Sequence, residues 1–226
     1  MTFIEPQQLE SLPHSLFIVT EGIGDARFVD ELLQFKGITN CSVGCPSIVS
    51  SGGSGKDAFP KYLASIQTAR SRIKSIPLRG ILVVADANGN AADSFETIVT
   101  AMRDATFPAP SRAFSIEEHG GLSVAVYLIP GEGETGTLEN ILLRAAFQKS
   151  PNFEKCLDDF SVCTGGLKSS KPNLQAKMRM SAVAATFCQD NPWCSPNTMW
   201  GDKNNPVPVN SACFNHICDF ITRFAT

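Results

Sequence analysis

The sequence predicts an α/β fold with a mostly parallel sheet flanked by helices. Short apolar segments alternate with longer helical patterns over the first 150 residues, which is typical of such a sheet. Residues 80–85 (GILVVA) are apolar without alternation, as expected of a central strand covered by helices on both faces. The last third contains helical patterns only. We therefore expect an α/β core over residues 1–150 and a helical C-terminal extension, packed on that core, over residues 151–226.

The first strand is expected over residues 15–20 (SLFIVT), ending at Glu21-Gly22, and the helical pattern behind it stops at Gly37. The central strand at 80–85 ends at Asp86. The other expected strands and helices follow from the same periodicities. The strands are expected at 42–49, 112–116 and 123–129. The helices are expected at 57–72, 93–105, 153–157, 173–188 and 211–224, and one more begins at about residue 137. A loop is expected at 191–208.

Composition excludes several classes of protein. The 226 residues include 19 Lys and Arg against 22 Asp and Glu, a net charge of −3, so overall charge gives no argument for nucleic-acid binding. A hydrophobic fraction of 43% supplies a core. No apolar run reaches the roughly 18 to 20 residues of a membrane span. Residues 1–13 lack the basic and apolar regions of a secretory signal, so we expect a cytoplasmic protein with reduced cysteines.

Three acidic residues stand where apolar strands end. Glu21 follows the first strand, Asp86 follows the central strand, and Glu139 lies just inside the helix after residues 123–129. If the strands are parallel neighbours, these carboxylates meet at one edge of the sheet. They would repel one another unless a cation lies between them, which indicates Mg²⁺ or Mn²⁺. The alternative for Glu21 and Asp86 is that each caps the helix that follows.

These motifs resemble the TOPRIM fold, a Rossmann-like metal-binding module of topoisomerases, primases and overcoming-lysogenization-defect (OLD) nucleases. The resemblance covers residues 15–144 and rests on IVTEGIGDARFVDELL, VVADANGN and GTLENIL. It is nearest to stand-alone prokaryotic TOPRIM-like proteins related to the OLD nuclease domain. It implies that Glu21, Asp86, Asn88 and Glu139 hold the metal, and that Lys177 in NLQAKMRM assists catalysis.

The resemblance implies a metal-dependent nuclease that cleaves phosphodiester bonds of DNA or RNA, with Glu21 and Asp86 as catalytic residues and a separate ATPase as a possible partner. Gly22 would let the backbone turn tightly beside a phosphate. The family's second acid is Asn88 here, which removes one negative charge that Asp25 or Asp93 could supply.

Two features leave alternatives open. Residues 50–57 (SSGGSGKD) imitate a phosphate-binding loop but depart from it at two positions, so Lys56 is a candidate phosphate contact and ATP hydrolysis by this chain alone is not expected. Asn88 also allows a catalytically inactive, TOPRIM-derived module that binds nucleic acid or protein. A phosphatase with Asp86 as nucleophile would want a second Asp at position 88. A homo-oligomer is a further possibility.

Overall fold

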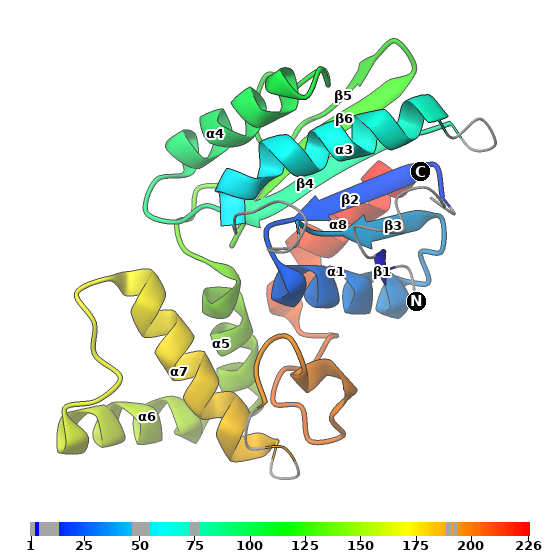
Figure 1. Ribbon diagram of the computed structural model, residues 1–226. Helices are drawn as coiled ribbons and strands as arrows, with labels where there is room; N and C mark the ends of the chain where they lie inside the picture. The colour runs from blue at the N-terminus through cyan, green and yellow to red at the C-terminus, as the bar shows by residue number, and fades with distance from the viewer. Residues whose placement is uncertain (1–2, 5–13, 47–54, 73–76, 189–190, 192–193) are drawn as a thin grey trace.

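The centre of the molecule is a six-stranded sheet (Figure 1) in a computed structural model that describes residues 3–4, 14–46, 55–72, 77–188, 191 and 194–226. The strand order is β1-β3-β2-β4-β6-β5. All neighbouring strands are parallel except β5 and β6, which are antiparallel. The strands are β1 (Phe3–Ile4), β2 (Leu16–Thr20), β3 (Cys41–Gly44), β4 (Gly80–Asp86), β5 (Ile116–His119) and β6 (Leu122–Ile129). The α/β class and the mostly parallel sheet predicted from the sequence are confirmed.

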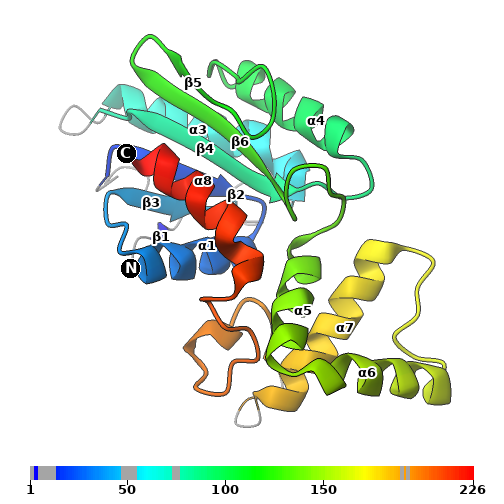
Figure 2. The same ribbon diagram turned by 180° about the vertical axis from the view of Figure 1, so that it is seen from behind.

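Helices cover both faces of the sheet (Figures 1 and 2). Alternate residues of a strand point to opposite faces. Ile18 and Leu82 lie in the core under α1 (Ile23–Lys36) and α8 (Asn215–Ala225). Phe17 and Ile81 lie in a second core under α3 (Phe59–Arg72) and α4 (Ala91–Asp104). Burial on both faces explains why β4 is apolar without alternation.

Three further helices form a group beyond the carboxyl ends of the strands (Figures 1 and 2). They are α5 (Leu138–Lys149), α6 (Pro151–Thr164) and α7 (Pro172–Phe187). Among the described residues, the short 3-10 helices η2 (Gly55–Ala58), η3 (Met199–Gly201) and η4 (Ala212–Phe214) join the longer elements. Helix α8 then returns to the sheet beside α1. In the described part of the chain, every helix is too short or too polar to cross a membrane.

The strand expected over residues 112–116 is wrong, because β5 begins only at Ile116. Phe114 has a positive φ of 62°, which extended strands do not adopt. The Glu117 carboxylate accepts hydrogen bonds from Ser111 N at 2.8 Å, Ser111 Oγ at 2.6 Å and Ser115 Oγ at 3.0 Å. These bonds close a turn in place of a strand. The strand expected over residues 42–49 ends at Gly44, and residues 47–49 lie outside the described residues.

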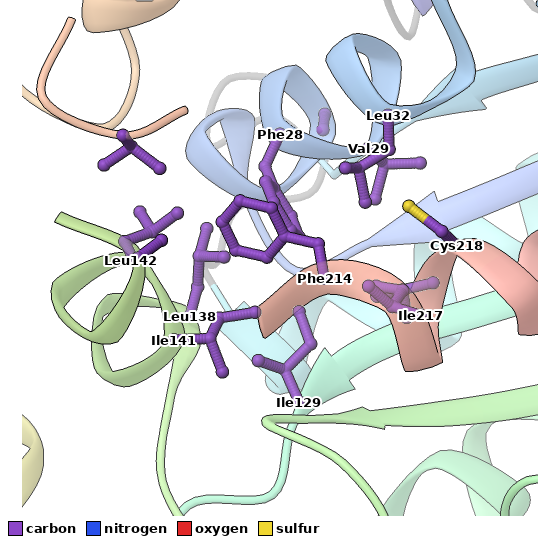
Figure 3. Close-up of a cluster of buried hydrophobic side chains, with 14 of the residues drawn as sticks. Phe28, Val29, Leu32, Ile129, Leu138, Ile141, Leu142, Phe214, Ile217 and Cys218 are labelled. Atoms are coloured by element: carbon purple, nitrogen blue, oxygen red, sulfur yellow. The ribbon is translucent and has the colours of Figure 1, made fainter. Parts of the chain in front are cut away.

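One buried cluster joins α1, α5 and α8 at the end of the sheet (Figure 3). The Phe28 ring of α1 lies 5.0 Å from the Phe214 ring in an edge-to-face arrangement, and 5.8 Å from the Trp200 ring. Leu138 and Ile141 of α5 lie in the same cluster. The cluster therefore fixes where the first turns of α1 and α5 begin.

We expect Phe28→Ala to lower the free energy of unfolding by about 3–5 kcal/mol, because it leaves a cavity among fully buried rings. Phe35→Ala on the same helix removes a ring that is 49% exposed, and should change that free energy by less than about 1 kcal/mol. Urea unfolding of both variants checks the difference. Equal effects of the two substitutions would contradict this packing.

Candidate functional site

The carboxyl ends of β2 and β4 form the point where the sheet topology reverses. From β2 the chain passes through α1 to β3 on one side, and it returns through α3 to β4 on the other side. The helices that follow β2 and β4, α1 and α4, lie on opposite faces of the sheet. The connections after β2 and β4 therefore leave the sheet in different directions. Such a switch point is where ligands bind in open α/β sheets. Glu21 follows β2, and Asp86 is the last residue of β4.

Two hydrogen bonds tie Glu21 and Asp86 to each other and to α5. The backbone N–H of Asp86 donates to Glu21 Oε1 at 2.8 Å, and the backbone N–H of Leu138 donates to Asp86 Oδ1 at 2.8 Å. Leu138 is the first residue of α5, so Asp86 accepts one of the N–H groups that a helix start leaves unpaired. Convergence at one sheet edge is thus observed for these two acids, and Asp86 caps α5 from outside it.

Asp25 and Glu139 bring two more carboxylates to this edge, each from the first turn of a helix. Burial, then repulsion by Glu21 and Glu139, raises the pKa of Asp25 to about 7. Burial and the charges of Asp25, Glu21 and Glu139 raise the pKa of Asp86 well above its usual range. Burial also raises the pKa of Glu21, against the opposing effect of Lys56. Burial and the neighbouring charges therefore favour the protonated forms of Asp25 and Asp86.

Glu139 is held by its own helix cap. Thr137 Oγ1 donates to Glu139 Oε2 at 2.7 Å, and Thr137 forms a capping box with Asn140. Gly22 precedes α1, and a side-chain carbon there would lie 3.5 Å from Asp25 Oδ2. That distance is an ordinary van der Waals contact, and the Gly22 backbone is extended with a φ of −155°, so the tight turn expected at Gly22 is not present.

Lys56 lies inside this cluster. Its Nζ donates to the backbone oxygen of Asp86 and to Ser94 Oγ, both at 2.6 Å, and lies 3.7 Å from Glu21 Oε1. The Lys56 side chain is only 14% exposed. The structure thus places Lys56, expected from the sequence as a phosphate contact, as a cation that partly neutralises Glu21. Of the loop-like motif, residues 50–54 lie outside the described residues, and residues 55–57 belong to η2.

Lys177 of α7 faces the carboxylates from the helical group. Its charge lowers the pKa of both Glu21 and Asp25. Within the described residues it has no ion pair at 4.0 Å or less, and it lines a cavity of about 850 Å³. The structure thus brings together Glu21, Asp25, Asp86, Glu139 and Lys177.

Asn88 lies beside Asp86, but its side chain is already engaged in hydrogen bonds. Its backbone pairs with Gly136 through two hydrogen bonds of 2.7 Å, and its φ is 55°. The Asn88 amide oxygen accepts from Asn173 Nδ2 at 2.8 Å, and its Nδ2 donates to the Asp86 backbone oxygen at 3.3 Å. The oxygen expected to coordinate a metal therefore already has a hydrogen-bond partner. Asp93, the other candidate replacement for the missing charge, is exposed in the first turn of α4.

The donor set suits a hard divalent cation, although it is not preassembled around one. No three His, Cys, Asp or Glu side chains among the described residues are already arranged to hold a metal ion. Glu21, Asp25 and Asp86 nevertheless offer carboxylate oxygens only, which Mg²⁺ and Mn²⁺ prefer. Burial raises the pKa of all three, and neighbouring carboxylates raise those of Asp25 and Asp86 further; a bound cation would oppose both effects. These three residues are the best candidates to hold it.

Comparison with known proteins identifies a family and no activity. Residues 15–223 match DUF3226, a family of proteins of unknown function, and the chain belongs to that family. No curated protein and no solved structure matches the chain.

We expect the apoprotein to lose stability as the pH rises. The Asp25 carboxyl group has a pKa of about 7 in the folded state and about 4 in the unfolded state, so the folded state binds more protons between these pH values. The stability that this protonation contributes is lost as the pH rises from about 4 to about 7. The amide of Asn does not ionise, so Asp25→Asn does not lose stability in this way. The free energy of unfolding in EDTA should therefore rise relative to the parent from about pH 5 to about pH 8, by on the order of 1–3 kcal/mol.

Urea unfolding across this pH range measures the effect. Asp104→Asn, at the exposed far end of α4, is the matched control and should follow the parent. Parallel profiles for Asp25→Asn and the parent would contradict the assignment of a raised pKa to Asp25.

Proposed function

We propose that the protein is a TOPRIM-like, divalent-metal-dependent nuclease that hydrolyses phosphodiester bonds of DNA or RNA. One observation carries the proposal: Glu21, Asp25 and Asp86 gather at the switch point of the sheet with raised pKa values, and Lys177 faces them. Buried acids with pKa values shifted in this way are candidates for functional groups. The order of these residues along the chain is also the order that suggested the TOPRIM resemblance.

Each residue has a part in the proposed reaction. Glu21, Asp25 and Asp86 would hold the ion, which polarises the phosphoryl oxygen and lowers the pKa of a bound water. Glu21 Oε1 is occupied by the Asp86 N–H, so its other oxygen is the one able to accept a proton from the attacking water. Lys177 would stabilise negative charge that develops on the phosphate, and Gly22, which directly precedes α1, would contact the phosphate through its backbone. A separate ATPase would act as a partner in this proposal, and a homo-oligomer remains compatible with it.

A second candidate function is a non-catalytic module that binds nucleic acid or protein. Two observations favour it. Asn88 replaces an acid and its amide oxygen is held by Asn173, and the Lys56 ammonium lies 3.7 Å from Glu21 where it offsets charge without a metal. In this alternative the carboxylate cluster is stabilised by lysines alone, and no turnover follows.

We expect the full chain to cleave labelled DNA or RNA when Mn²⁺ or Mg²⁺ is present. Glu21→Gln and Asp86→Asn should each lower the cleavage rate by at least about a hundredfold, because each removes a metal ligand or base. Asp104→Asn should retain the parent rate. Gel assays on single- and double-stranded substrates measure these rates.

The outcomes separate the two candidates. Cleavage that survives in both acidic variants would show that this cluster is not the active centre. Binding of nucleic acid by the parent without cleavage under any of these ions would support the non-catalytic module.

A further inference from the structure

The cavity beside the carboxylates has walls from three separate parts of the fold. Asn88 and Gly89 follow β4, Thr135 and Gly136 precede α5, and residues 170–174 with Lys177 come from the start of α7. Its volume of about 850 Å³ lies within the roughly 300–1,000 Å³ of small-molecule sites. The size admits a nucleotide with its surrounding water.

The lining of this cavity is positively charged in a chain that is negative overall. Lys171 and Lys177 both line it, and none of its lining residues is acidic. Helix α7 also begins here, with Lys171 at its N-cap position and no side chain capping its first N–H groups. Two ammonium groups and a helix start together favour an anion such as a phosphate.

The other residues that line the cavity offer apolar surface and amide groups that a base could contact. Leu174 is 48% exposed although it is a large apolar residue, and with Pro172 it presents an apolar surface to the cavity. Asn140 and Asn173 line the same space, and the Asn140 amide oxygen is taken by Thr137 N at 2.8 Å. Apolar side chains against the base face, with hydrogen bonds to the base edge, are one way in which proteins hold an unstacked base.

We propose that this cavity is a nucleotide-binding subsite, which holds one unpaired nucleotide of the substrate with its phosphate directed toward Lys177 and the carboxylates. The inference deepens the proposed nuclease function and rests on it for the position of the phosphate. Lys177 lines the cavity and also acts electrostatically on Glu21 and Asp25, so it connects the two places. Lys171, Asn173 and Leu174 also line the cavity, where they would contact the nucleotide and take no part in hydrolysis.

Calorimetric titration of the full chain with AMP and dAMP in EDTA tests the subsite without metal or cleavage. Lys171→Ala and Asn173→Ala should each weaken nucleotide binding by about tenfold, the effect of losing one charge-assisted or well-placed hydrogen bond. Lys168→Ala removes the same charge from an exposed residue of the same loop that does not line the cavity, and should leave binding unchanged. Thermal unfolding of each variant verifies folding.

Two comparisons decide the class of ligand. The monophosphates should bind more tightly than either inorganic phosphate or adenosine, since each of these lacks one half of the nucleotide. Equal binding of phosphate and AMP would reduce the cavity to an anion site and overturn the inference. Nucleotide binding that is unchanged in Lys171→Ala and Asn173→Ala would also overturn the inference. The absence of any nucleotide binding would overturn it too.

The failure of the proposed nuclease is distinguishable from the failure of the subsite. If nucleotides bind with the expected dependence on Lys171 and Asn173 but no nucleic acid is cleaved, the subsite holds and the nuclease function is wrong. If cleavage depends on Glu21 and Asp86 but AMP and dAMP do not bind, the nuclease function holds and the subsite is wrong.

Discussion

Burial of several carboxyl groups close together at the ends of β2 and β4 is the constraint around which this part of the molecule is arranged. Glu21, Asp25, Asp86 and Glu139 act on one another through partly buried surroundings, where charges are screened less than in water. The protein offsets this with the Asp86 and Leu138 N–H groups, the Lys56 ammonium and the more distant Lys177. These contributions leave the pKa values of Glu21, Asp25 and Asp86 raised, so compensation is incomplete. Incomplete compensation is the physical basis for expecting a cation.

The position of this cluster depends on packing far along the chain. Asp25 and Glu139 are placed by the first turns of α1 and α5, and those helices meet Phe214 and Ile217 in one buried cluster (Figure 3). The last helix, α8, covers the same face of the sheet as α1. The C-terminal part of the chain therefore supports the geometry of the site, and α7 also contributes Lys177 to it.

Local patterns predicted the features that depend on neighbouring residues. The apolar run of β4 and its end at Asp86 follow from burial on both faces, and Gly37 closes α1 with a φ of 67° as its sequence position indicates. The meeting of Glu21 and Asp86 follows from the parallel strands, but other contacts between distant residues were not predictable. Asn173 lies 85 residues from Asn88, and nothing in its surroundings marks it as the partner of that amide. Lys56 was recognised within a glycine-rich segment, but its position against Glu21 depends on how α3 packs behind β4. The positive φ of Phe114 likewise depends on the Glu117 carboxylate, which organises the turn before β5.

Anomalous diffraction from crystals grown with Mn²⁺ tests the central claim most directly, because it locates the ion without requiring a substrate, a partner or turnover. The account predicts an anomalous peak among the carboxylates of Glu21, Asp25 and Asp86, within about 2.5 Å of their oxygens, a generous limit for ligands of such ions. A well-ordered cluster with no peak at saturating Mn²⁺, and Lys56 still against Glu21, would contradict it.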